Sequence, residues 1–143
     1  LSSYQMLGDH MRSVLMRSSM HTLKDLPPSH WRLRDHANII YTFFPTTQLL
    51  VQQDHIVWIN SRPVSATATE LRLVTLAPIS RLEEHEYWEK NHRITLNTLN
   101  EDFVIGESIQ AGLATGANEH MTFGRFEGAL PEFNRLVKRY TSV

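Results

Sequence analysis

The sequence contains no cysteine in its 143 residues. It therefore has no disulfide framework, no thiolate ligand for zinc or an iron–sulfur cluster within the chain, and no cysteine nucleophile. Any metal bound by these residues must be held by nitrogen and oxygen atoms. The sequence also lacks an apolar run of about 18 residues and a charged-then-apolar leader, which predicts a cytoplasmic protein without a membrane partner.

Net charge is nearly absent as well, because 14 basic residues stand against 15 acidic ones and leave a formal charge of −1. No bulk electrostatic attraction to nucleic acid or to an anionic membrane is expected. Small molecules and other proteins remain as partners. The length and the hydrophobic content of 41% suit one domain with a moderate core, so residues 1–143 are interpreted as a single domain.

The first half of the chain has the pattern of β-structure. Runs rich in β-branched, aromatic and other apolar residues, bounded by turn residues, predict strands at 12–16, 38–44, 49–53, 56–60 and 67–77. A short helix is expected after Ser18, and Pro27 stops it. The close spacing of the runs predicts an antiparallel meander with turns at Asp54-His55 and around Arg62-Pro63.

After Pro78 the apolar period changes from two residues to about three and a half, which predicts helix. Apolar residues recur at three- and four-residue steps from Trp88 to Leu113, and a last helix is expected from Pro131 through Tyr140. Strands followed by long helices predict an α+β fold in which helices cover one face of a curved sheet.

Thr98 and Glu101 have the form of a capping box inside the long helical stretch. This pattern predicts a break near residues 97–100, with Asp102 in the first turn of a second helix. An acidic residue at that position is favoured by the helix dipole whether or not a metal is near.

A set of residues in the last third of the chain has a distinctive order. An acidic pair leads a helix that carries a Glu, then a Gln and a Gly-Leu, followed by a Gly-Arg turn and an amphipathic helix. These positions are Glu101-Asp102, Glu107, Gln110, Gly112-Leu113, Gly124-Arg125 and residues 133–140. The pattern resembles the C-terminal part of the catalytic domain of Rieske-type aromatic ring-hydroxylating oxygenase large (alpha) subunits. A second stretch agrees with it, at residues 31–36, Tyr41, Phe44-Pro45 and Asp54-His55.

The resemblance implies an incomplete copy of a helix-grip, Bet v1- or START-like fold around mononuclear Fe(II), which two histidines and one carboxylate hold. It carries Asp102 over as that carboxylate, and so as the catalytic and metal-binding residue of this chain. Three facial ligands leave neighbouring positions on the iron open, so that O2 binds beside the substrate. Leu99 and Phe103 adjoin Asp102 and are predicted to bind the substrate.

The sequence departs from the family pattern upstream of Asp102. None of its eight histidines matches the family's closely spaced pair of iron ligands, and the cysteines of a Rieske cluster are absent. The chain also opens on Leu1. We therefore expect the C-terminal portion of a catalytic domain that is inactive alone, with the Rieske [2Fe-2S] cluster in a separate N-terminal domain.

The implied activity is hydroxylation of an aromatic or similar small organic substrate with O2, as in the catabolism of aromatic compounds. The resemblance also implies a reductase or ferredoxin as electron donor, and assembly into a homo-oligomer, a trimer.

Other interpretations remain open. His85, Glu89 and His92 share one helix face and contain the donor types of a facial metal site, although such residues are also typical of a solvated face. A non-catalytic helix-grip module would bind an apolar ligand in a cavity lined by Tyr41, Phe43, Trp58, Leu73, Leu99 and Phe103. A subunit used only for assembly would pair through an open sheet edge.

Overall fold

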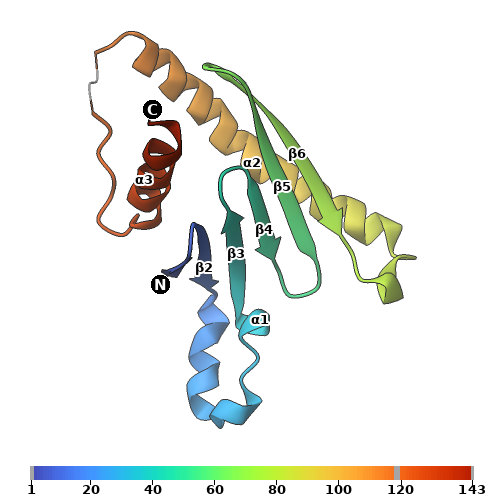
Figure 1. The fold of residues 1–143 in the computed structure, drawn as a ribbon. Helices are drawn as coiled ribbons and strands as arrows, with labels where there is room; N and C mark the ends of the chain where they lie inside the picture. The colour runs from blue at the N-terminus through green and yellow to red at the C-terminus, as the bar shows by residue number, and fades with distance from the viewer. Residues whose placement is uncertain (1, 118–119, 143) are drawn as a thin grey trace.

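The computed structural model describes residues 2–117 and 120–142. In this part of the chain the strands form one antiparallel sheet and are hydrogen-bonded in sequence order (Figure 1). They are β1 (Ser2–Leu7), β2 (His10–Met16), β3 (Ala37–Phe43), β4 (Thr47–Val51), β5 (Ile56–Ser65) and β6 (Ala68–Leu76). The predicted meander is therefore confirmed, and β1 is a strand that the sequence pattern did not reveal.

Two long helices follow the sheet, α2 (His85–Ala114) and α3 (Ala129–Thr141). Shorter helical turns lie between β2 and β3, at Ser18–Asp25, Pro28–His30 and α1 (Leu33–His36), and before α2 at Ile79–Arg81. Strands followed by helices make the molecule α+β, in agreement with the helix-grip class of fold. No helix within the described ranges is long and apolar enough to cross a membrane.

The predicted break in the long helix is wrong. α2 runs through residues 97–100 without interruption, and Thr98 Oγ1 donates a hydrogen bond to the carbonyl of Ile94 instead of capping a new helix. Asp102 consequently lies in the middle of α2. The helix dipole, which acts within the first turn, does not explain an acidic residue there.

The predicted turn around Arg62-Pro63 is also misplaced. Pro63 lies inside β5 opposite Thr69, and the turn itself falls at residues 66–67. The pairing of β5 with β6 is irregular between Pro63 and Ser65, which is the kind of position where a sheet tolerates proline.

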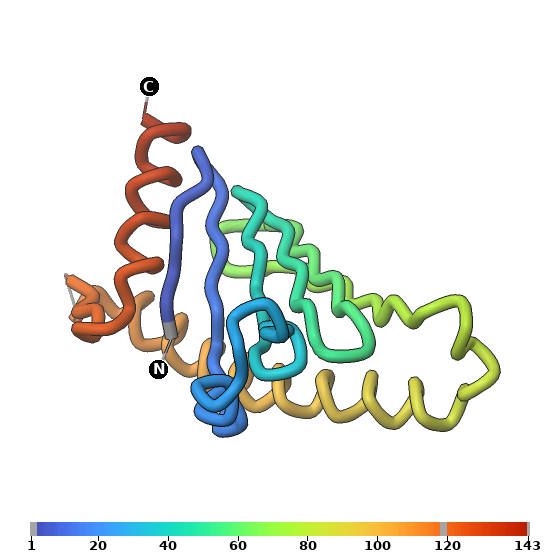
Figure 2. The backbone as a smooth tube through the Cα atoms, turned by 90° about the horizontal axis from the view of Figure 1, so that it is seen from below, coloured from blue at the N-terminus to red at the C-terminus, as the bar shows by residue number. Residues whose placement is uncertain are grey.

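Alternation along the strands divides the side chains between two faces of the sheet. Val57 and Ile59 are buried, and Leu73 lies opposite Ile59 on the same face. α2 runs along this face (Figure 2). Leu73 accordingly shares a hollow with residues of α2.

Trp58 lies between Val57 and Ile59 and therefore points to the other face. Leu49 pairs with Trp58 and Tyr41 pairs with Leu49, so Tyr41 is on that face too. Phe43, two residues further along β3, shares it. The prediction that Tyr41, Phe43 and Trp58 line a cavity under the helix is wrong. Their side chains point to the face of the sheet opposite to the one that carries Leu73 and faces α2.

α3 lies beside the edge of the sheet formed by β1 (Figure 2). A Cβ atom added to Gly128, at the start of α3, would come within 2.8 Å of the Tyr4 ring in β1. Leu136 in the middle of α3 is fully buried, and Arg139 Nη1 lies 3.2 Å from Asp9 Oδ1 in the β1–β2 turn. These contacts join the two ends of the chain.

Candidate functional site

Asp102, the predicted metal ligand, is exposed on α2. Within residues 2–117 and 120–142, no three His, Asp or Glu side chains come together in a group that could hold a metal ion. The described residues therefore do not make an iron site by themselves. The role of Asp102 as a ligand stays a prediction.

The rival site on the same helix does not form. His85 and Glu89 are exposed, whereas His92 is half-buried and its Nδ1 lies 2.9 Å from Thr75 Oγ1 of β6. This hydrogen bond turns His92 toward the sheet and uses one of its ring nitrogens. The hypothesis of a metal site at these three residues is wrong for this structure.

Leu99 and Phe103, the predicted substrate residues, lie between α2 and the sheet. They border two adjoining hollows of about 350 and 480 Å³. We call the first of these the inner cavity. Ile59 of the sheet and Phe133 of α3 contribute to its walls together with Leu99 and Phe103.

The two sides of the inner cavity differ in chemistry. The helices present apolar side chains, whereas the sheet adds hydroxyl and amide groups from Thr42, Gln48, Ser61 and Thr69. A mainly apolar space with a few polar groups suits a small organic molecule, which the polar groups orient. The sequence did not reveal this polar wall, because its residues come from four strands.

A polar cluster fixes the N-terminal end of α2 to the sheet. His55, in the β4–β5 turn, is only 4% exposed, and its Nδ1 lies 2.8 Å from Asp54 Oδ1. The other carboxylate oxygen of Asp54 accepts hydrogen bonds from the Tyr87 hydroxyl at 2.5 Å and from Arg81 Nη1 at 3.3 Å. Burial acts to raise the pKa of Asp54, but the hydrogen bonds from Tyr87 and His55 outweigh it and lower the pKa to about 2.

Aromatic packing completes this cluster. Trp88 is 9% exposed, and its Nε1 donates to the carbonyl of Arg81 at 2.7 Å. The Trp88 ring meets those of His55 and Tyr87 edge to face, at centroid distances of 5.8 and 4.8 Å. The Arg81 guanidinium lies 4.9 Å from the centroids of both Tyr87 and Trp88. We call Asp54, His55, Arg81, Tyr87 and Trp88 the Asp54 cluster.

A hollow of about 820 Å³, larger than the inner cavity, lies between α3 and the β1–β2 and β3–β4 turns. We call it the outer pocket. The Phe44 ring lies 5.5 Å from that of Phe133 and 5.4 Å from that of Tyr140. The sequence did contain a signal for this surface, because Phe133, Val137 and Tyr140 recur at four- and three-residue steps along the last helix.

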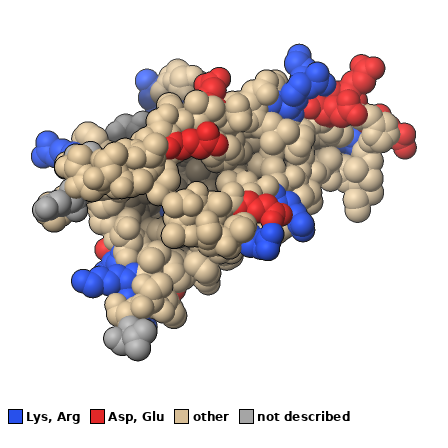
Figure 3. Space-filling view, turned by 90° about the horizontal axis from the view of Figure 1, so that it is seen from above, with Lys and Arg blue, Asp and Glu red and all other residues tan. Residues whose placement is uncertain are grey.

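Charged side chains are scattered over the face of the molecule drawn in Figure 3. Figure 3 shows Lys, Arg, Asp and Glu in small groups on a mainly uncharged surface, in keeping with the formal charge of −1. The described walls of the inner cavity contain no charged residue, and those of the outer pocket contain one carboxylate, Asp9. Both hollows therefore suit apolar molecules better than ions.

The chain matches the model of a known protein family. The sequence model of the family described as ring hydroxylating alpha subunit (catalytic domain) matches residues 2–142 of this chain. No curated protein and no solved structure matches the chain. The family match spans the sheet, both long helices and all the hollows described above.

Proposed function

The chain belongs to the family of ring-hydroxylating alpha subunit catalytic domains, and we propose that it forms the C-terminal portion of such a domain in a Rieske non-haem iron oxygenase. In this proposal the complete subunit hydroxylates an aromatic or similar small organic molecule with O2. The electrons come from a reductase or ferredoxin through a Rieske [2Fe-2S] cluster in another domain. The observation that carries the proposal is the family match over residues 2–142.

Asp102 is proposed as the carboxylate ligand of the iron. On the surface of α2 it neighbours Leu99, one turn earlier, and it precedes Phe103, so it adjoins two walls of the inner cavity. The described residues do not join Asp102 in a set of three metal-binding side chains. The proposal therefore assigns the two histidine ligands to another part of the alpha subunit.

Leu99 and Phe103 are proposed to hold the apolar ring of the substrate against the sheet. Their side chains exclude water from one side of the inner cavity, while Thr42 and Gln48 offer hydrogen bonds from the other. This arrangement positions a molecule without charged contacts, which suits an uncharged aromatic compound.

The ligand role of Asp102 is tested in the complete alpha subunit with Asp102→Asn. The amide is a poor substitute for a carboxylate ligand of Fe(II), so iron content and aromatic-dependent O2 uptake are expected to fall by more than about 10-fold. Glu101→Gln is the matched control, since it removes the adjacent exposed carboxylate and is expected to leave both values unchanged. Equal iron content in the two variants would reject the assignment.

The isolated chain offers a second test of the same proposal. One carboxylate does not hold Fe(II) at a facial site, so metal analysis is expected to find no stoichiometric iron and oxygen electrode measurements no uptake. Tight binding of one iron per chain together with turnover would show that the chain is a complete oxygenase rather than a portion of one.

A second candidate function, binding of an apolar small molecule without catalysis, is favoured by the hollows beside α2. Here the complete protein would bind aromatic compounds and show no O2 uptake with any of them. Asp102→Asn would then leave every measured property unchanged.

The proposal also includes assembly into a homo-oligomer. β6 lies at one end of the strand order, and Leu71, Val74 and Leu76 are exposed on it. An exposed apolar edge strand is a site where another strand can pair. Size-exclusion chromatography with light scattering tests this point, and a strictly monomeric chain would count against it.

A further inference from the structure

The outer pocket and the inner cavity share part of their walls. Pro45, Thr46, Pro63 and Phe133 line both hollows. Phe133 is half-buried, and its ring meets that of Phe44 nearly edge to face at 5.5 Å. The two hollows therefore adjoin, and the Phe133 ring borders both.

The outer pocket has the walls of an aromatic binding site. The Phe44 ring lies 5.5 Å from that of Phe133 and 5.4 Å from that of Tyr140, and Leu7 and Val137 add aliphatic surface. Aromatic rings favour offset or edge-to-face contacts with a further ring. The volume of about 820 Å³ lies in the range of about 300 to 1,000 Å³ that is usual for small-molecule sites.

The one carboxylate of this pocket is already paired. Asp9 Oδ1 lies 3.2 Å from Arg139 Nη1, and Asp9 Oδ2 accepts the hydroxyl hydrogen of Tyr140. The hydrogen bond to Asp9 and the negative charge of this carboxylate raise the pKa of Tyr140 above its usual value. An uncharged ligand disturbs none of these contacts.

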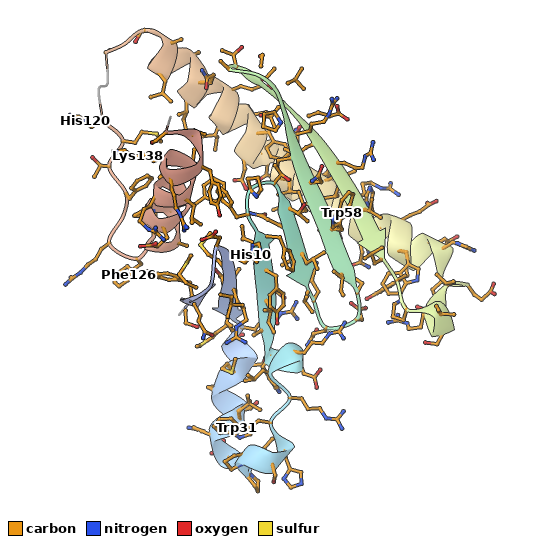
Figure 4. The ribbon with its side chains drawn as sticks, viewed as in Figure 1. His10, Trp31, Trp58, His120, Phe126 and Lys138 are labelled. Atoms are coloured by element: carbon orange, nitrogen blue, oxygen red, sulfur yellow. The ribbon has the colours of Figure 1, made fainter. Side chains whose placement is uncertain are left out.

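His10 adds a polar group of defined tautomer to the outer pocket. It lies at the end of β2 nearest α3 (Figure 4), and its Nδ1 accepts the backbone N–H of Phe44 at 3.2 Å. In the neutral ring this bond leaves the hydrogen on Nε2. The described lining contains no Lys or Arg, so a carboxylate ligand would meet Asp9 without a cation of its own.

We propose that the outer pocket is a second binding site for neutral aromatic molecules, and that Phe133 is the partition between this site and the inner cavity. The inference deepens the proposed function, on which its biological meaning rests, because the ligand class is that of the proposed substrate. Binding to the outer pocket requires neither iron nor turnover, so it is measured on the isolated chain.

Equilibrium dialysis with radiolabelled naphthalene tests the site without interference from tryptophan fluorescence. Val137→Trp and Thr141→Trp each place an indole in the outer pocket, and each is expected to weaken naphthalene binding at that pocket by at least about 10-fold. Leu130→Trp is the matched control on α3, since Leu130 is 45% exposed and lines neither hollow. It is expected to bind as the wild type does.

Leu99→Trp distinguishes binding in the inner cavity from binding in the outer pocket, because Leu99 lines only the inner cavity of the two. Because Leu99 is also a proposed substrate residue, this variant is expected to lose binding in the inner cavity and to retain the naphthalene binding that Val137→Trp removes. The inference is overturned if the wild type binds no naphthalene, if Leu99→Trp abolishes all binding, or if neither pocket-filling variant weakens it. Circular dichroism establishes whether each variant is folded. If Val137→Trp does not fold, Thr141→Trp replaces it as the pocket-filling variant.

The preference for neutral molecules is tested with 1-naphthoate in the same assay. The carboxylate is expected to bind at least about 10-fold more weakly than naphthalene, because the described lining has no Lys or Arg and the nearby Arg139 is already paired with Asp9. Equal affinities would contradict the proposed ligand class.

The partition is tested with pyrene, a larger ring system. Phe133→Ala joins the two hollows and is expected to strengthen pyrene binding by at least about 10-fold. Phe126→Ala is the control, because Phe126 is 89% exposed and lies outside the helices (Figure 4). Equal pyrene binding by the wild type and Phe133→Ala would show that Phe133 does not separate the two hollows.

The oxygenase function and the outer binding site can be rejected independently of each other. Absence of aromatic-dependent O2 uptake in the complete subunit, with naphthalene binding still lost in Val137→Trp, rejects the oxygenase function and supports the outer site. Uptake that depends on Asp102, with naphthalene binding unaffected by both pocket-filling variants, supports the oxygenase function and rejects the outer site.

Discussion

The two halves of α2 meet the sheet in different ways. In the first half, Trp88 is buried within the Asp54 cluster and His92 is hydrogen-bonded to β6. From the middle of the helix onward, Leu99 and Phe103 border open space, and Phe103 is 38% exposed. Trp88 is the one buried residue within this 30-residue helix.

This difference shows how a helix keeps its position above a cavity. A dense group of buried aromatic rings, hydrogen bonds and ion pairs fixes one end, so the other end does not need to pack tightly. The residues proposed to bind a substrate therefore lie on a rigid element but contribute little to its anchoring. Stability and function are expected to respond to mutations in different halves of α2.

The largest effect on stability is expected for Trp88→Ala. Loss of the buried ring, of its hydrogen bond to Arg81 and of the cavity-filling volume is expected to cost about 3 to 5 kcal/mol in the free energy of unfolding. Urea denaturation followed by circular dichroism measures it. Trp31→Ala is the control, since Trp31 is 45% exposed and a loss of about 1 kcal/mol is expected. Equal losses would show that the cluster is not the anchor.

Asp54→Asn is expected to cost roughly 1 to 2 kcal/mol at neutral pH and to change the pH dependence of stability. The folded pKa of about 2 lies below the usual 3.8, so the ionised carboxylate stabilises the folded state. This contribution is complete above about pH 4 and is lost as the pH falls toward 2.

The pH dependence is checked by urea denaturation at a series of pH values. The curves of wild type and Asp54→Asn are expected to converge between about pH 4 and 2, whereas Asp25→Asn, an exposed carboxylate, should follow the wild type throughout. A constant gap between wild type and Asp54→Asn across this window would exclude the linkage.

Phe103→Ala is expected to destabilise the protein by only about 1 kcal/mol. Its ring borders a cavity and is partly exposed, so its removal loses less apolar contact than that of a core ring. The measurement is the same denaturation experiment. A loss as large as that of Trp88→Ala would show that Phe103 is as important to stability as Trp88. The two parts of α2 would then not differ in how they are anchored.

The smallest effect on stability is expected for Asp102→Asn. An exposed side chain away from caps and buried networks usually changes stability by less than about 0.5 kcal/mol. The melting temperature of the isolated chain measures it. A large loss would assign Asp102 a structural role and weaken its proposed role as a ligand.

Local patterns in the sequence predicted most of the fold. β-branched runs located five of the strands, and the change of period after Pro78 located the helices. The capping box at Thr98 failed because its residues also suit a helix interior, where Thr98 bonds to Ile94. β1 was missed because Ser2–Leu7 contains no run of β-branched residues.

The sites depended on contacts that no local pattern contains. Asp54 meets Tyr87 and Arg81 only because the β4–β5 turn faces the start of α2. Trp58 and Ile59 are adjacent in sequence, and only the position of α2 decided which of them faces the helix. The prediction that Leu99 and Phe103 bind substrate remains untested, although both line a cavity.

The pairing of Asp9 with Arg139 and Tyr140 has a consequence for the order in which the molecule assembles. The meander forms between strands that follow one another in sequence, so its loops close early and at low entropic cost. α3 reaches the β1–β2 turn only after all of the residues between them have been synthesised. We therefore expect the outer pocket to be the last part of the fold to close, and a ligand held there to favour the docked position of α3.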